Sequence, residues 1–553
     1  MKNNNNLSIY IHTPFCKSKC NYCNFYSINP ENINGAELQK IYNTHRSPNR
    51  SHNYYHHHGH DNSPDNSPDN IHYNSYNNIH DIYLQSLIKE LKIISEKYNL
   101  NNNFTHSRIV KTIYFGGGTP SVMNINFFDE IINNIYKTFA VSDNPEITVE
   151  VNPESAVLDK LKSLRSLGIN RLSIGAQSFN DNVLKIAGRL HSSDDILRCV
   201  NDSRKCGFNN ISLDLMLGLP GQTAEILQKD IDYLISIRPE HISAYILSIE
   251  KGSKFYKNLK KLRMRSEENR ENNENEHNGN ERNKYEHSKN EYSKNEHNEN
   301  EHNKYEHSKN EYNENEHNEY KERKEDELAD FYITASEEFS SSGYKHYEIS
   351  NFALNGFESK HNINYWERGE YIGLGPAASS FIKQTVNCSV HNNADNNSSS
   401  RNIDDNRGDM DNNNYYYRSN NRDIKKLEIR ITNKPNLIEY INKISNFEKK
   451  ILQSENKKNK LIKYKIEEFK TDEEILTKKN IINEKFFLSL RTYKGINVKI
   501  IYKYADRKII DELIKAGFAE IYATGDRLHM RHYLRLTLKG MLVSSEIFSK
   551  ILL

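Results

Sequence analysis

The sequence is short of hydrophobic residues. Of its 553 residues, 36% are hydrophobic. If tyrosine is left out and glycine is counted, the fraction is about 34%, against roughly 45–50% in globular chains. Such a chain cannot be packed uniformly, so either the whole protein is loose or polar tracts dilute a normal core. It also lacks any run of 18 apolar residues, which excludes a membrane-spanning helix.

Cysteine is scarce as well, and neither positive nor negative charge is in excess. The six cysteines are too few for a disulfide scaffold. Lys and Arg total 76 against 74 Asp and Glu, and this net charge of +2 gives no general electrostatic argument for binding nucleic acid. The N-terminal residues pass directly into an apolar alternation, leaving no room for a presequence. We therefore expect a cytoplasmic protein without membrane or nucleic-acid partners.

The missing hydrophobicity is concentrated in three polar tracts, at about 43–81, 263–326 and 387–423. The second tract contains the same ten residues twice, at 283–292 and 303–312, but this repeat offers only tyrosine as an apolar residue and cannot stack as a solenoid. All three tracts are predicted to be low-complexity inserts, and the first is expected to be disordered. The remaining residues, roughly 410, suit one large domain and a smaller one.

Outside the inserts, short apolar runs alternate with amphipathic helical patterns. This order predicts an α/β fold in which parallel strands are joined by right-handed crossovers. Six units of this kind make a partial barrel, whose active site lies at the C-terminal ends of the strands. The predicted strands are Leu7–His12, Thr112–Phe115, Ile147–Val151, Arg171–Ile174, Ile211–Leu217 and His241–Leu247, and the helices between them include 127–139, 158–167, 194–205 and 224–237.

Half of the cysteines cluster directly after the first predicted strand. Cys16, Cys20 and Cys23 have three and then two residues between them. Structural zinc needs four ligands, whereas three thiolates on a four-iron cluster leave one iron open for a small molecule. Zinc and simple packing are the alternatives. The spacing resembles the radical S-adenosylmethionine (SAM) superfamily, and this resemblance implies a [4Fe-4S] cluster that chelates SAM. It also implies reductive cleavage of SAM to methionine and a 5′-deoxyadenosyl radical.

Further motifs follow the predicted strands in the same order. Glycines end the second strand and let the backbone approach a ligand closely, while acidic and basic side chains lie at later strand ends, where they can bind a carboxylate or ribose hydroxyls. Each of these charged residues alone could instead be an ion pair or a helix cap. No general acid or base can be identified.

Four longer motifs narrow the resemblance. The segments 10–16, 115–121, 213–220 and 347–352 are similar to the oxygen-independent coproporphyrinogen III oxidase family. The similarity covers most of the chain outside the inserts and the Lys-rich stretch near 450–480. It implies a radical SAM core at 1–262 and a family-specific extension at 327–386. The SAM-contacting residues it implies are Tyr10, Tyr22, Gly117, Gly118, Thr119, Glu150, Gln177, Arg189 and Asp214.

Two departures indicate one branch of that family. The oxidase has a fourth cysteine where this sequence has Phe25, and the His-Asn-x-x-Tyr-Trp motif at 361–366 resembles the haem chaperone branch. This resemblance implies that His361 binds haem and that the protein passes haem to acceptor proteins. Without it, His361 is more simply a hydrogen-bonded loop histidine and Trp366 a core residue. Ser379 stands where relatives often have histidine, which questions a haem role at that position.

The C-terminal part, 424–553, resembles the small helical, winged-helix-like domain that closes this family. Its basic residues are Arg527, His529, Arg531, His532 and Arg535. No aromatic stacking array accompanies them, so nucleic acid is not the expected partner. Three functions therefore stand side by side: a haem chaperone, the oxidase, which would decarboxylate coproporphyrinogen, and a radical enzyme acting on RNA.

Overall fold

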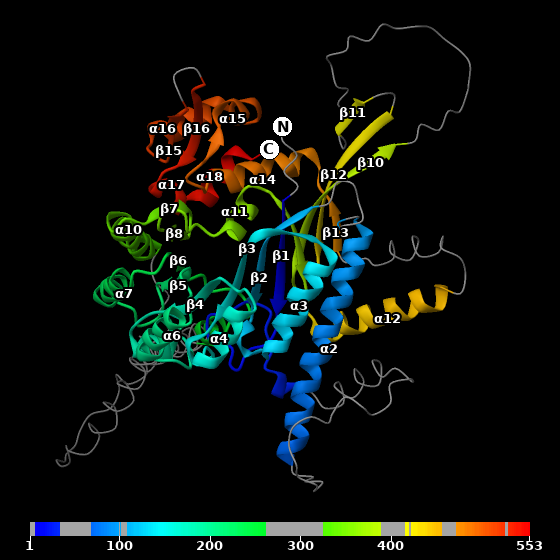
Figure 1. Cartoon of the computed structure of the whole chain (residues 1–553). Coiled ribbons are helices and arrows are strands. Elements are labelled where there is room, and N and C mark those ends of the chain that lie inside the picture. The colour runs from blue at the N-terminus through cyan, green and yellow to red at the C-terminus, as the bar shows by residue number, and fades with distance from the viewer. Residues whose placement is uncertain are drawn as a thin grey trace, which may run out of the picture.

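One large sheet runs through most of the chain (Figure 1). The computed structural model describes residues 6–33, 68–98, 100, 108–261, 325–388, 415–419, 422–455, 472–525 and 529–552. Among these residues, thirteen strands form a sheet in the order β11-β12-β10-β9-β1-β2-β3-β4-β5-β6-β8-β7, and β13 pairs with β12.

The middle of this sheet is the predicted parallel unit. Each strand from β1 to β6 pairs in parallel with the next. The strands are β1 (Asn6–Thr13), β2 (Ile109–Gly117), β3 (Ala140–Val151), β4 (Arg171–Gln177), β5 (Ile211–Leu217) and β6 (His241–Ile246). The connecting helices are α3 (Ile125–Thr138), α4 (Leu158–Ser166), α5 (Asp181–Ile186), α6 (Ser193–Lys205) and α7 (Ala224–Ile237). The structure confirms the predicted α/β fold, with its six parallel strands as neighbours in one sheet.

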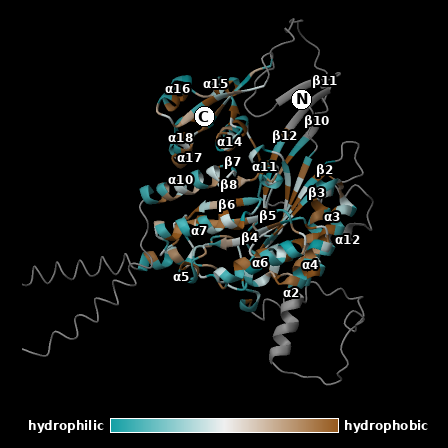
Figure 2. Cartoon of the chain, turned by 60° about the vertical axis from the view of Figure 1, so that its left-hand side comes forward, coloured by the Kyte–Doolittle hydropathy of each residue, from teal (hydrophilic) through white to brown (hydrophobic). Residues whose placement is uncertain are grey.

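Side chains alternate between the two faces of these strands. In β1, Leu7, Ile9 and Ile11 are fully buried in the main hydrophobic core, and the helices that cover this face carry both hydrophobic and hydrophilic residues (Figure 2). The residues between them are polar and meet polar residues of neighbouring strands, as where Thr112 donates to Ser8. One face of the sheet therefore forms the core, and the other offers polar groups to a site.

The sheet extends beyond the predicted unit on both sides. Strand β9 (Glu370–Leu374) lies parallel to β1, and β8 (Asn351–Ala353) and β7 (Lys345–Glu348) continue antiparallel from β6. The strands β10 (Ser379–Cys388), β11 (Tyr415–Ser419), β12 (Arg422–Thr432) and β13 (Asp472–Ile475) are antiparallel. The extension between β6 and β9 also contains α10 (Glu325–Ser341) and α11 (Lys360–Trp366).

Two predicted boundaries need correction. The first insert was expected to extend to residue 81, but helix α2 (Pro68–Lys97) begins before that, and Ile79 is buried because it continues the apolar face of the helix. The C-terminal domain was expected to begin at residue 424, which lies inside β12. Helix α12 (Leu437–Glu455) also belongs to the large domain, because Ile441 packs in the main core. Most of the three predicted inserts lies outside the described residues.

A second hydrophobic core begins after β13. It is built around Phe486 and Leu534 and surrounds a three-stranded antiparallel sheet in the order β14-β16-β15. Its elements are α14 (Lys478–Ser489), β14 (Ile496–Asn497), α15 (Val498–Tyr504), α16 (Arg507–Lys515), β15 (Ala519–Thr524), β16 (Arg531–Leu536), α17 (Leu538–Leu542) and α18 (Ser544–Ile551). None of the helices in the described part of the chain combines the length and apolarity needed to cross a membrane.

Candidate functional site

The three clustered cysteines lie on the loop that follows β1. Cys16, Cys20 and Cys23 are free and half-buried. Backbone hydrogen bonds hold the loop: Cys16 N donates to Ile28 O at 3.0 Å, and Cys23 N donates to Cys20 O at 3.2 Å. Burial raises the pKa of the Cys16 and Cys23 thiols. These two thiols therefore need a metal or another cation nearby to become thiolates at neutral pH.

The cysteine loop opens on a cavity of about 560 Å³ at the C-terminal ends of the parallel strands. All three cysteines line it. So do most of the residues for which SAM contacts are predicted: Tyr22, Gly117, Gly118, Thr119, Glu150, Gln177, Arg189 and Asp214. Residues that are far apart in the sequence meet here because parallel strands bring their C-terminal ends to one edge of the sheet.

The glycines at the end of β2 allow this strand to approach the cysteine loop. A Cβ atom added to Gly118 would lie 2.7 Å from the carbonyl oxygens of Thr13 and Phe15 and 3.1 Å from Cys16 Sγ. Gly117 has φ +110°, a conformation that other residues rarely adopt. Close backbone approach was predicted toward a ligand; the structure shows a close approach to the cysteine loop.

Two half-buried carboxyl groups face the cavity. Glu150 accepts hydrogen bonds from Tyr114 OH at 2.9 Å and from Gly117 N at 3.0 Å. Asp214 accepts a hydrogen bond from Ser173 Oγ at 3.2 Å. Burial raises the pKa of Glu150 to about 7 and that of Asp214 to about 6. Both carboxyl groups would be stabilised in their ionised form by a cationic or hydroxyl-rich ligand.

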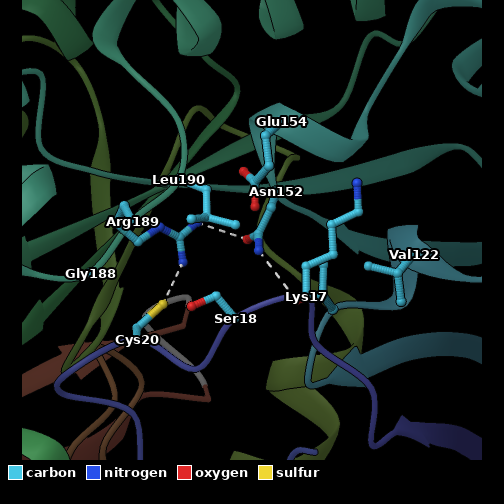
Figure 3. Close-up of a pocket in the computed structure, with 10 residues that line it drawn as sticks. Lys17, Ser18, Cys20, Val122, Asn152, Glu154, Gly188, Arg189 and Leu190 are labelled. Carbon is cyan, nitrogen blue, oxygen red and sulfur yellow. Dashed lines mark hydrogen bonds between the residues drawn. The ribbon is translucent and has the colours of Figure 1, made fainter. Parts of the chain in front are cut away.

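Arg189 lies between the cysteine loop and β3 (Figure 3). Its Nη1 donates to Cys20 Sγ at 3.3 Å, and its Nη2 donates to Asn152 Oδ1 at 2.8 Å. The buried Nε has no hydrogen-bond partner among the described residues. Because an unpaired buried donor is costly, this atom is available to an anionic ligand in the cavity.

The structure adds site residues that the sequence did not reveal. Asn152 also donates from Nδ2 to Thr119 Oγ1 at 3.2 Å, which links the end of β2 to Arg189. Glu154 Oε2 lies 3.1 Å from His191 Nδ1, in hydrogen-bonding distance and beside the same arginine. The Asn-Pro-Glu sequence directly after β3 was the available signal, since polar residues at strand ends belong to the site edge.

Gln177 has φ +67°, a strained conformation that is concentrated at functional sites.

This site and fold have known counterparts. Residues 100–234 match the family model described as Radical SAM superfamily. The protein named heme chaperone HemW of Bacillus subtilis is 29% identical over 69% of this chain and 73% of its own length, and that of Lactococcus lactis is 27% identical over 68% and 69%. The chain contains a radical SAM domain. The solved structure of coproporphyrinogen III oxidase (HemN) from Escherichia coli shares its fold, with a TM-score of 0.55 and 17% identity over 98% of this chain and 89% of the other.

Among members of the radical SAM superfamily, the chain is similar to the relatives named heme chaperone. The site fits the two cofactors of the superfamily. Three cysteine thiols face one cavity with the unpaired Arg189 Nε. The loop supplies three thiols, which suits a four-iron cluster with one open iron better than a structural zinc ion with four ligands.

The chain's own residues divide between the two cofactors. The three cysteines would hold the iron–sulfur cluster, which supplies one electron to SAM when both are bound. Glu150, Arg189 and Asp214 would bind the charged and hydroxyl groups of SAM by charge-assisted hydrogen bonds.

Tyr10 does not line this cavity, although a SAM contact was predicted for it. Its hydroxyl lies 3.2 Å from His12 Nδ1, and its ring faces a second cavity beside β9. The rings of Tyr10, Tyr114 and His361 contact one another, with centroid distances of 6.1 Å between Tyr10 and Tyr114, 4.9 Å between Tyr114 and His361 and 6.5 Å between Tyr10 and His361. Tyr10 therefore belongs to the wall of the second cavity.

His361 is in a position that does not fit the predicted haem ligand. It is 1% exposed. Its Nδ1 hydrogen-bonds Thr112 Oγ1 at 2.7 Å, and its Nε2 hydrogen-bonds Tyr365 OH at 2.9 Å. Burial lowers its pKa to about 3, so the ring is neutral. Because both ring nitrogens are engaged, His361 acts in this structure as a packing residue that ties α11 to β2.

Three of the basic residues near the C-terminus, Arg531, His532 and Arg535, lie on β16. Arg535 donates to Glu520 at 2.7 Å, and its guanidinium lies 3.9 Å from the centre of the Tyr493 ring. Arg531 and His532 are exposed on β16. Arg527 lies outside the described residues. With Arg535 already paired, the geometry adds no support for nucleic acid as a partner.

Proposed function

We propose that this protein is a cytoplasmic haem chaperone with a radical SAM fold, which binds haem and passes it to acceptor proteins. The observation that carries the proposal is the composition of the cysteine loop. Two residues after Cys23 stands Phe25, which is 69% exposed and lines the cluster cavity. The loop thus offers three thiols for the cluster and an aromatic side chain, rather than a fourth thiol, on the open side.

The relatives support the same proposal. Proteins named heme chaperone HemW match about two thirds of this chain at 26–29% identity, whereas the likeness to the oxidase structure is one of fold. The oxidase is the second candidate, because the cavity holds half-buried carboxyl groups beside the cluster loop. No contact of the described residues favours the third candidate, an enzyme acting on RNA.

The deciding experiment is a pair of assays on protein whose cluster has been reconstituted without oxygen. A chaperone binds haem, transfers it to an apo-haemoprotein and does not turn over coproporphyrinogen. Decarboxylation of coproporphyrinogen would overturn the proposal in favour of the oxidase. A Phe25→Cys variant is the matched control for the loop: it restores a fourth thiol without changing the three cluster cysteines.

A further inference from the structure

A second cavity lies beside the SAM cavity, on the side of β1 that faces β9. Its volume is about 570 Å³, within the range of roughly 300–1,000 Å³ that small-molecule and cofactor pockets occupy. The strand β1, the end of the cysteine loop, α11 and the loop between β9 and β10 all contribute to it. The roles assigned above to the cluster and SAM residues do not involve this second cavity.

The lining of this cavity is aromatic and carries no acidic, lysine or arginine side chain. Four half-buried tyrosines, Tyr10, Tyr26, Tyr365 and Tyr371, present their rings to it, and small residues such as Ala378 leave space between them. Such rings stack on a flat conjugated molecule. A ligand like SAM, whose amino and carboxylate groups need charged partners, finds none among these side chains.

Phe25 and Asn24 line both cavities. The Phe25 side chain is the most exposed large hydrophobic group in the described part of the chain, at 69%. An aromatic ring in water at the boundary of an aromatic cavity is available to cover a ligand there. Lys19, which is exposed, donates from Nζ to Phe25 O at 3.2 Å and places a positive charge at this boundary. The surroundings thus match a flat apolar ring with acidic substituents at its rim.

We propose that haem binds in this tyrosine-lined cavity, with Phe25 as its outer cover, and that His361 is not its iron ligand. The inference rests on the proposed function and specifies where the cargo lies. Two independent observations carry it: the aromatic cavity next to the cluster loop, and the engagement of both His361 ring nitrogens with Thr112 and Tyr365. The His-Asn-x-x-Tyr-Trp motif then contributes Tyr365 to the wall of the haem site rather than an imidazole to the iron.

The test is a haem titration of the full chain, with its cluster reconstituted, followed by Soret absorbance and protein fluorescence. Ser379→Trp fills the cavity with a large side chain and should raise the haem Kd by about tenfold or more. Phe25→Ala removes one stacking ring from an exposed position and should raise it about fivefold. Met216→Trp, which fills the SAM cavity instead, is the matched control: it should weaken SAM binding and leave haem binding unchanged.

The spectrum tests the second half of the proposal. In His361→Gln the Soret maximum should stay at its wild-type position, because the imidazole is not bound to iron; a shifted maximum would overturn this assignment. Wild-type haem affinity in both Ser379→Trp and Phe25→Ala would overturn the cavity assignment and leave the chaperone proposal standing. If Ser379→Trp also loses its cluster, the haem affinity of Phe25→Ala alone decides the cavity assignment. A wild-type protein that binds no haem would refute the proposed function itself.

Discussion

At the scale of single residues, Cys20 connects the predicted cluster to Arg189. Its thiol accepts a hydrogen bond from Arg189 Nη1 at 3.3 Å and lines the cluster cavity. We expect Cys20→Ala to abolish the iron–sulfur charge-transfer absorbance after reconstitution, because two thiolates cannot hold the cluster. Cys199→Ala is the control: this cysteine is buried in the main core and should leave the spectrum unchanged. An unaltered spectrum in Cys20→Ala would refute the ligand assignment.

A second residue-scale prediction concerns Glu150. Burial raises the pKa of its carboxyl group to about 7. A bound cationic group favours the ionised carboxylate, so SAM affinity should rise as the pH rises through 7 and fall below it. For one group with this pKa, binding at pH 6 should be about tenfold weaker than at pH 8. Equilibrium dialysis with SAM across this pH range measures the effect.

Glu150→Gln is the matched control for that titration. The amide keeps the shape of the side chain and can still accept a hydrogen bond from Tyr114, but it does not ionise. SAM affinity should be lower in this variant at pH 8 and nearly independent of pH between 6 and 8. A variant that keeps the full pH dependence would show that another group, such as Asp214, is responsible.

At the scale of elements, a buried carboxyl group ties helix α2 to the rest of the large domain, in addition to the apolar face of the helix. Glu90 accepts hydrogen bonds from Gly375 N at 2.8 Å, from Asn433 Nδ2 at 2.6 Å and from Tyr440 OH at 2.6 Å. Glu90→Leu leaves these three buried donors without an acceptor, so it should lower the free energy of unfolding by roughly 3 kcal/mol or more. Denaturant unfolding measures this, and Glu96→Leu at an exposed position of α2 should change it by less than about 0.5 kcal/mol.

The loss of stability in Glu90→Leu should depend on pH in a defined direction. The fold raises the pKa of Glu90 to about 7, above its ordinary value of 4.5, mainly through burial. The unfolded chain therefore releases this proton first, and the stability that the protonated group contributes is lost as the pH rises from about 4.5 to 7. The difference between wild type and Glu90→Leu should be largest at the acidic end of this range. A difference that grows toward pH 7 would contradict the assignment.

Elements with a regular apolar pattern were predictable, and those set by distant contacts were not. Strand β5 (Ile211–Leu217) and helix α7 (Ala224–Ile237) have the predicted ends, because alternating or helical periodicity is recorded locally in the sequence. Strand β9 pairs with β1 across more than 350 positions, which periodicity cannot show. The same distinction applies to the site. Glu150 and Asp214 could be predicted from their positions on the strands, but the hydrogen bonds of both His361 ring nitrogens depend on contacts with β2 that the sequence does not show.

At the scale of the whole molecule, the two hydrophobic cores are joined through the segment before α11. Ile349 N donates to Arg491 O, and Tyr493 N donates to Tyr347 O, both at 3.0 Å. Ile349 also packs against the C-terminal core. Within the same segment, Glu348 is hydrogen-bonded by the Trp366 side chain at the end of α11. The C-terminal domain thus supports the segment that holds the His-Asn-x-x-Tyr-Trp motif in place.

This arrangement predicts that damage to the second core spreads to that motif. Phe486→Ala removes a fully buried ring from the C-terminal domain, a change that typically costs about 3–5 kcal/mol. Amide hydrogen exchange should then accelerate in the C-terminal domain and also in residues 345–366, whose hydrogen bonds to Arg491 and Tyr493 depend on it. Exchange in β5 should stay unchanged, and Met530→Ala, at an exposed position, should affect neither region. Unchanged exchange in 345–366 would mean that the large domain holds the motif without the C-terminal domain.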